Sequence, residues 1–279
     1  MFDGVRGGWG LTKKAWAVIR SNPALARLPL TGGGLALIVF VVLGIPGVLL
    51  VGSDGTGATI GGIVVLAIAA YLASFAVIYF NVALAAAADQ MMRGEEPDLS
   101  AATGVARSRV GKIAAWALAS AAVSAVLTAL RGRGSTAGNL GASIGADIWS
   151  LVTFLVVPVL AFEGIGPFAA IKRSAVLFRQ RWGQQVTGDV VIGGVSGLIV
   201  LVGIVLGVVG MVLVADGGHG AELAGGLLIV VGATVGVGGA VFGGATRGVF
   251  GVALYRYVAE DRTLGPFTTA DLDAAARTR

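Results

Sequence analysis

The chain contains no cysteine and only one histidine, His219, among 279 residues. The lack of cysteine excludes disulfides, thiolate metal sites and cysteine nucleophiles, and with the single histidine in a predicted loop the common catalytic triads are unavailable. His219 lies near Asp216 and Glu222, which could indicate a metal or pH-sensing site, but a solvated loop is the favoured interpretation. Neither a phosphate-binding glycine-lysine motif nor a Gly-x-Ser-x-Gly motif is present. We therefore expect no enzymatic activity, no cofactor and no bound metal.

Charge is also scarce. Charged residues make up 13% of the chain and hydrophobic residues 56%, with a mean hydropathy of +0.89. One soluble core could not bury so much apolar surface, so the composition indicates a membrane protein. The net charge of +5 comes from bases that lie beside apolar runs, which favours anionic lipid headgroups over nucleic acid as the partner. Arginine outnumbers lysine. Alanine, glycine and valine are abundant, and this composition is typical of a high-GC bacterium.

Six apolar runs are long enough to cross a hydrocarbon core of about 30 Å. They cover residues 28–51, 59–88, 112–130, 140–162, 186–214 and 223 onwards. Of the twenty basic residues, only Arg131 and Arg133 fall in the loops that would face outward; the other eighteen lie at the N-terminus, in the second and fourth connections and in the C-terminal part. This asymmetry predicts a multi-pass protein of the bacterial cytoplasmic membrane with both termini in the cytoplasm.

The stretch from Glu163 to Trp182 joins the fourth and fifth spans and predicts an amphipathic helix that starts near Gly166 and Pro167. Its apolar residues repeat every three or four positions, which places them on one helical face: Phe168, Ile171, Ala175, Phe178 and Trp182. We call this stretch the elbow. Bases lie off its apolar face, and a similar basic segment begins the chain. The predicted headgroup-binding residues are Lys13, Lys14, Arg20, Lys172, Arg173, Arg179 and Arg181.

Parts of the chain repeat. Residues 13–20 match residues 172–179 with every charge in register, residues 107–111 match 179–183, and residues 80–84 match 250–254. Gly166-Pro167-Phe168 recurs as Gly265-Pro266-Phe267. We therefore expect an all-α, polytopic membrane protein with six transmembrane helices, built as three parallel repeats of an amphipathic elbow helix and a two-helix hairpin. The repeats cover about 1–92, 93–163 and 164–261 of one integral membrane domain, and residues 265–279 form an amphipathic tail.

Glycine is frequent in the last two spans, where several pairs are spaced four apart. Such pairs put small residues on one helical face and allow close helix packing, either within the chain or in a homo-oligomer or a complex with a membrane partner. The pairs are Gly193/Gly197, Gly203/Gly207, Gly232/Gly236, Gly239/Gly243 and Gly244/Gly248.

Four polar residues in or beside the spans are candidates for a function inside the membrane. Asn81 is favoured as a contact between helices over a ligand contact. Asp147 lies only about 6 Å into its span by helix rise, so contact with the outer surface or with Arg131 competes with a transport role. Asp189 and Arg247 lie equally far from the turn near Gly218, which predicts an ion pair at the cytoplasmic boundary. Pro158 predicts a kink.

The chain resembles an uncharacterised family of multi-pass membrane proteins from bacteria and archaea. The residues that carry the resemblance are Phe80-Asn81-Val82-Ala83-Leu84, Glu163-Gly164 with Gly166-Pro167-Phe168, Ala170-Ile171-Lys172-Arg173-Ser174, and Ala253-Leu254-Tyr255-Arg256-Tyr257. The elbow is more distantly similar to the membrane domain attached to some glycerophosphodiester phosphodiesterases. No catalytic domain of that kind is present, so the resemblance implies an architecture and no hydrolase residues.

These observations favour a non-enzymatic membrane protein whose basic interfacial helices organise lipid or a membrane partner. A transporter or channel subunit for a small solute or lipid, using the glycine-lined bundle and Asp147, is the alternative, and an integral-membrane lipid enzyme is the third possibility. A polar cavity reaching Asp147 would separate the first two.

Overall fold

We describe the fold from a computed structural model, for residues 2–131, 136–181, 187–215 and 219–276. The described residues form helices with no strand among them, as expected. In chain order the helices are α1 (Phe2–Ser21), α2 (Ala24–Val39), the π-helical turn η1 (Phe40–Gly44), α3 (Ile45–Val51), α4 (Thr56–Met92), α5 (Leu99–Ser108), α6 (Val110–Arg131), α7 (Thr136–Thr153), α8 (Val156–Phe162), α9 (Pro167–Arg181), α10 (Thr187–Ala215), α11 (His219–Glu260) and α12 (Thr269–Ala276).

Within the described residues, six helical segments are long and apolar enough to cross a membrane, which confirms the predicted number of spans and indicates a multi-pass membrane protein. They run over Ala24–Val51, Thr56–Met92, Val110–Arg131, Leu140–Phe162, Ser196–Val214 and Gly220–Glu260. The elbow helix is also confirmed, since α9 begins at Pro167 as predicted. The short helix before the third span, α5, begins after Asp98, whose carboxylate accepts from the amides of Ser100 and Ala101.

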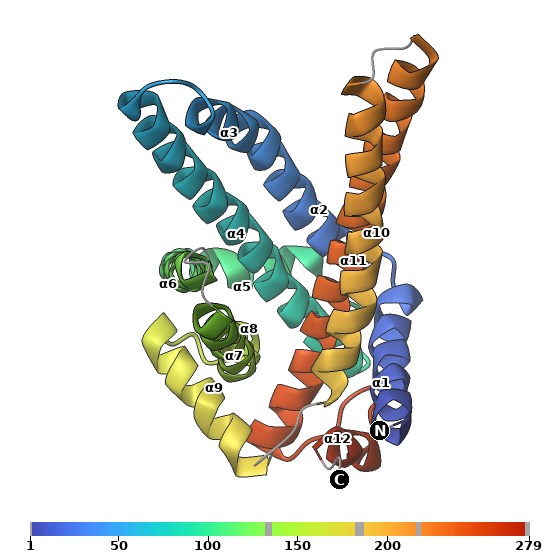
Figure 1. Cartoon of the computed structure of the whole chain (residues 1–279). Helices are drawn as coiled ribbons and strands as arrows, with labels where there is room; N and C mark the ends of the chain where they lie inside the picture. The colour runs from blue at the N-terminus through green and yellow to red at the C-terminus, as the bar shows by residue number, and fades with distance from the viewer. Residues whose placement is uncertain (1, 132–135, 182–186, 216–218, 277–279) are drawn as a thin grey trace.

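Consecutive spans pair as hairpins, and the first and third hairpins diverge from a common end of the molecule (Figure 1). The first hairpin is α2–α3 with α4, and the third is α10 with α11. In this view the second hairpin, α6 with α7 and α8, is seen close to end-on, so it runs across the other two (Figure 1). Helices α1, α9 and α12 lie at the end where the first and third hairpins meet, and we call this end the base (Figure 1).

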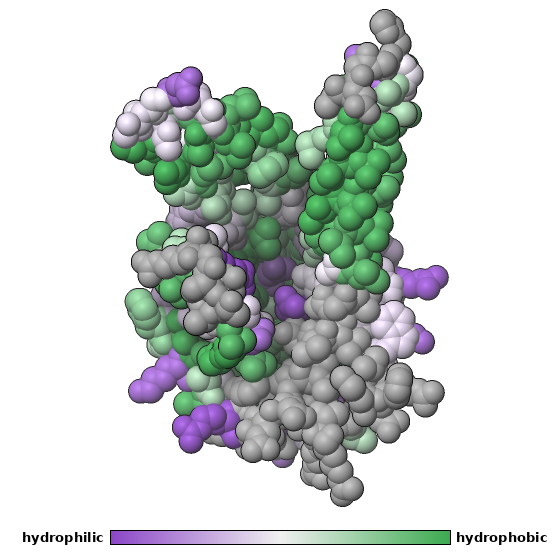
Figure 2. Space-filling model, viewed as in Figure 1, coloured by the Kyte–Doolittle hydropathy of each residue, from purple (hydrophilic) through white to green (hydrophobic). Residues whose placement is uncertain are grey.

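The buried core lies at the base. The C-terminal part of α4, from Val82 to Ala88, is buried, and it packs with the buried C-terminal part of α11, from Val249 to Tyr255. Phe250 packs against Phe154 and Phe267, with ring centroids 6.0 and 6.3 Å apart. The two segments that match in the sequence, 80–84 and 250–254, therefore belong to one core. Away from the base the hairpins expose apolar side chains, and Figure 2 shows apolar surface over the upper parts of both outer hairpins.

Glycine lets the helices of the third hairpin touch along their backbones. A Cβ atom on Gly203 would lie 2.6 Å from the carbonyl oxygen of Gly232, and one on Gly232 would lie 2.5 Å from that of Gly203. Gly210 and Gly225 approach each other in the same way. The predicted glycine packing is therefore present inside the α10–α11 hairpin, which leaves these glycines covered and not free to contact a partner chain.

The fourth span bends between α7 and α8, at Phe154 and Leu155. Pro158 explains the bend, because a proline cannot donate to the carbonyl four residues earlier. The amide of Leu155 is instead satisfied by the buried hydroxyl of Ser174 on α9, at 3.2 Å. The predicted kink thus also fixes the elbow helix to the span before it.

Candidate functional site

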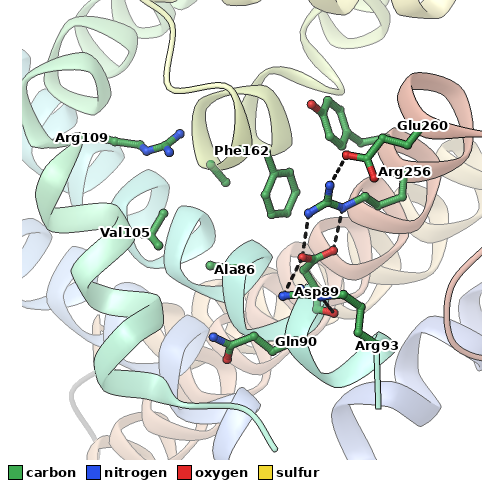
Figure 3. Close-up of a pocket in the computed structure, with 11 residues that line it drawn as sticks. Ala86, Asp89, Gln90, Arg93, Val105, Arg109, Phe162, Arg256 and Glu260 are labelled. Atoms are coloured by element: carbon green, nitrogen blue, oxygen red, sulfur yellow. Dashed lines mark hydrogen bonds and ion pairs between the residues drawn. The ribbon is translucent and has the colours of Figure 1, made fainter. Parts of the chain in front are cut away.

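Charged residues of α4 and α11 pair at the base. The side chain of Asp89 is only 3% exposed and accepts two hydrogen bonds from Arg256, each of 2.8 Å. Arg93 lies 3.3 Å from the same carboxylate, and Arg256 also pairs with Glu260 (Figure 3). The guanidinium carbon of Arg256 lies 4.3 Å from the centre of the Phe162 ring on α8. One arginine therefore ties three helices together.

A polar cavity of about 390 Å³ lies beside this cluster. Arg93, Arg109 and Arg256 line it together with only two carboxylates, Asp89 and Glu260, so positive charge is in excess. Arg109, at the junction of α5 and α6, points toward the cavity (Figure 3) and donates to the backbone carbonyl of Leu160. Burial lowers the pKa of Arg109 from its usual value. The cavity thus suits an anion better than a cation.

The elbow helix α9 is held to the base by Glu163. Its Oε1 accepts from Nε of Arg173 at 2.8 Å and from the hydroxyl of Tyr255 at 3.0 Å. Lys112 donates to the carbonyl of Gly164, in the loop before α9. Gly164 itself has a φ of +59°, which favours glycine. Helices α6, α9 and α11 all contact this loop, so several helices together hold its geometry.

The N-terminal helix α1 is held in a related way. Lys14 pairs with Asp271 of α12, and the carboxylate of Asp271 also accepts from the amide of Thr268 at 2.8 Å. Burial raises the pKa of Asp271, but the hydrogen bonds from Lys14 and Thr268 outweigh it and leave the pKa below its usual range. The tail is further anchored by buried Phe267 and Leu272 and by the amide of Gly265, which donates to Met92.

Helices α1 and α9 present equivalent faces when they are aligned by their matching charges. Leu11, Ala15 and Val18 of α1 are buried, and so are the residues aligned with them in α9, Ala170, Ser174 and Leu177. Lys14 and its counterpart Arg173 each pair with a carboxylate. The remaining bases are exposed in both helices: Lys13 and Arg20 in α1, Lys172 and Arg179 in α9.

Exposed apolar side chains accompany these bases. In α1, Trp9 and Trp16 alternate with Lys13 and Arg20 at helical spacing, and Lys13 lies 5.5 Å from the centre of the Trp9 ring. Trp16 is only partly exposed, because its ring also packs against Phe242 of α11 at 4.8 Å between ring centroids. In α9, Phe168 is 80% exposed and lies one turn before Lys172. Within the described part of the chain, none of the four exposed bases forms an ion pair. Each helix therefore has one face against the protein and one outward face that combines bases with large apolar groups.

Of the four intramembrane candidates, the side chains of Asn81, Asp147 and Arg247 lie in the described part of the chain, and neither of the two cavities brings two of them together. Asp147 is exposed on α7 and lines neither of the two cavities described here. Asn81 lines an apolar cavity between α2, α4 and α11. Arg247 is exposed on α11 and does have an interaction, whereas the side chain of Asp189 lies outside the described residues, so their pairing stays a prediction. The side chains of Arg181, Phe178 and His219, and residues Trp182 and Arg133, also lie outside the described part.

Sequence reasoning missed the residues that tie the base together. In the sequence these residues lie at the ends of spans, where a charge is ordinarily solvated: Asp89, Glu163 and Arg256. Their signal was their position within or next to the matching segments, since Arg256 and Tyr255 follow residues 250–254 and Asp89 follows residues 80–84. Two segments that share a sequence pattern and a buried core also bring together the charges that follow them.

Comparison with known families adds an assignment. A family model, described as a family of unknown function (DUF6159), matches residues 58–265. The chain belongs to this family. The matched residues include the Asp89–Arg256 and Glu163–Tyr255 contacts, whereas Lys14 and Asp271 lie outside them. No curated protein and no solved structure matches the chain. The more distant resemblance to the membrane domain of glycerophosphodiester phosphodiesterases gains no support from these comparisons.

Proposed function

We propose that this multi-pass membrane protein binds anionic lipid at its base through the outward faces of α1 and α9, without catalysing a reaction. The observation that carries the proposal is the equivalence of these two faces. Each helix buries three residues at matching positions, pairs one base with a carboxylate and exposes two further bases beside large apolar side chains. Such a face suits the boundary between headgroups and acyl chains.

Charge supports an anionic headgroup over a neutral one. Each base near an anionic surface contributes about 1 kcal/mol at low ionic strength, so four bases on two helices give a clear preference. The polar cavity at the same end also carries excess positive charge. In this proposal the base faces the cytoplasm, with both termini, and rests on the inner leaflet of a bacterial cytoplasmic membrane.

The transporter or channel alternative relies on Asp147. That residue lines neither described cavity, so no observation here favours this alternative over lipid binding. The equivalent faces of α1 and α9 are also consistent with the proposed three-repeat organisation.

The test compares lipid binding by two variants of the purified protein in detergent. The first variant replaces four bases by glutamine: Lys13, Arg20, Lys172 and Arg179. The control variant replaces the exposed bases Arg107 and Arg131 by glutamine. Native mass spectrometry measures the binding of phosphatidylglycerol relative to phosphatidylcholine. We expect the preference for phosphatidylglycerol to fall by about tenfold or more in the first variant, by the electrostatic contribution per base. The control variant should keep the preference of the wild type for phosphatidylglycerol. An unchanged preference in the fourfold variant would refute the proposal.

A further inference from the structure

An apolar cavity of about 260 Å³ lies between the first and third hairpins. Its walls include Gly33 and Leu37 of α2, Val77 of α4, and Val237 and Gly244 of α11. Figure 2 shows a hollow between these two hairpins with apolar surface on both sides. The cavity exists partly because glycine leaves space, since a Cβ atom on Gly244 would meet no atom within 4 Å.

Asn81 is the polar side chain in this apolar lining. Its amide has no hydrogen-bond partner among the described residues, which differs from the helix contact expected from the sequence. An amide without a partner is costly in hydrocarbon, where water cannot replace one. The side chain therefore favours an occupant that is apolar along most of its length and carries a hydrogen-bonding group at one point.

The position of the cavity in the span suggests what this occupant is. Pro29, at one end of the α2 wall, lies near the start of the first span, close to the base, and Leu37 lies about 12 Å deeper by helix rise. Asn81 lies in the base half of α4. The cavity thus runs from near the membrane boundary into the hydrocarbon, which is the direction of a lipid chain. A helix is about 10 Å across and would not fit.

We propose that this cavity binds one acyl chain of a glycerolipid from the leaflet on the side of the base, and that the Asn81 amide donates a hydrogen bond to its ester carbonyl. The chain fills the space beside Gly244, and the apolar walls give it a dry contact surface. The site does not depend on headgroup charge. It can therefore be tested with a zwitterionic lipid, so that its failure and the failure of anionic-lipid binding at α1 and α9 are separate results.

The experiment uses the full chain in vesicles of phosphatidylcholine that contain a trace of phosphatidylcholine with a diazirine in one acyl chain. After irradiation, mass spectrometry maps the labelled residues. In the wild type we expect label concentrated on residues 29–37, 77–81 and 237–244. Gly244→Leu fills the cavity and should reduce this label about tenfold, the effect of losing about 1.4 kcal/mol of binding. Gly238→Leu changes an exposed glycine of the same helix, whose Cβ would also meet no atom, and should leave the label unchanged.

The carbonyl contact has its own test. An ether-linked phosphatidylcholine lacks the ester carbonyl, so the wild type should label more with the ester than with the ether probe, by about threefold for one intramembrane hydrogen bond. Asn81→Leu keeps the volume and should label equally with both probes. Equal labelling by both probes in the wild type would overturn the role of Asn81. Label spread evenly over exposed apolar faces, and unaffected by Gly244→Leu, would overturn the site itself.

Discussion

Asp89 and Arg256 lie 167 residues apart in the chain and are joined by two hydrogen bonds of 2.8 Å, with the carboxylate almost fully buried. The pair connects the end of α4 to the end of α11, and so connects the first hairpin to the third. Both residues follow the matching segments 80–84 and 250–254 at the end of a span. These two side chains therefore add a buried ion pair to the apolar core that joins two hairpins far apart in sequence.

Replacing Asp89 by asparagine should strongly destabilise the base. The change leaves Arg256 and Arg93 without their shared carboxylate, and breaking a buried ion pair costs about 3 kcal/mol or more. Thermal unfolding in detergent measures the effect. Asp54→Asn, at the exposed tip of the first hairpin, is the control and should have little effect. A double-mutant cycle with Arg256→Gln should be clearly non-additive, and additive losses would contradict the coupling.

Replacing Glu163 by glutamine should loosen the elbow helix. The neutral side chain loses the ion pair with Arg173 and weakens the hydrogen bond from Tyr255, at a cost of about 1–2 kcal/mol. Hydrogen exchange of the backbone amides in residues 167–177 should become faster, while exchange in α6 changes little. Glu222→Gln, an exposed change in the third hairpin, should leave α9 unaffected. Unchanged exchange in α9 would show that other contacts hold it.

Docking of the C-terminal helix on α1 should weaken in acid. The pKa of Asp271 is lowered in the folded chain, so its contribution to stability is present above the ordinary carboxyl pKa of about 3.9 and is lost as the pH falls through the lowered value. A dye on a cysteine introduced at exposed Ala270 reports the docking. Its signal should change below about pH 4. Asp271→Asn should give the acid signal at neutral pH, and a pH-independent signal in both proteins would contradict the prediction.

Gly203→Ala should destabilise the third hairpin. The added methyl group would meet the backbone of Gly232 and Gly236 at 2.5–2.6 Å, which forces α10 and α11 apart, and such overpacking costs about 1–3 kcal/mol. Gly226→Ala on α11 meets open space and is the matched control. Thermal unfolding in detergent should separate the two variants, and equal melting temperatures would show that the helices adjust without cost.

The orientation in the membrane can be tested because the chain has no cysteine of its own. Glu96 follows α4 near the base, and Asp54 lies at the tip of the first hairpin; both are exposed. With the base in the cytoplasm, an impermeant thiol reagent added to intact cells should label Asp54→Cys and leave Glu96→Cys unlabelled until the cells are opened. The reverse pattern would overturn the orientation.

The sequence predicted the spans and the elbow well, because long apolar runs and the 3–4 spacing of α9 are local signals. The face of α9 that contacts the rest of the protein was harder to predict from the sequence. The buried face carries Ala170 and Ser174, which are small or polar and therefore weak signals, whereas exposed Phe168 gave the strongest apolar signal. The ion pairs at the base could not be predicted from spacing, because they join residues on helices far apart in the chain. The pairing of Asp189 with Arg247 was argued from spacing alone and still awaits a test.

Helices α4 and α11 contain 37 and 42 residues, whereas about 20 residues of helix cross the hydrocarbon. Both are therefore long enough to continue past the bilayer, and in the proposed orientation their buried ends form a small core at the base on the cytoplasmic side. The hydrophobic effect stabilises such a core, but helix contacts in lipid depend on close packing. Chemical denaturants act on surface exposed to water. Urea should thus unfold the base first and leave helical hairpins in the membrane, so a single free energy of unfolding would not describe this chain.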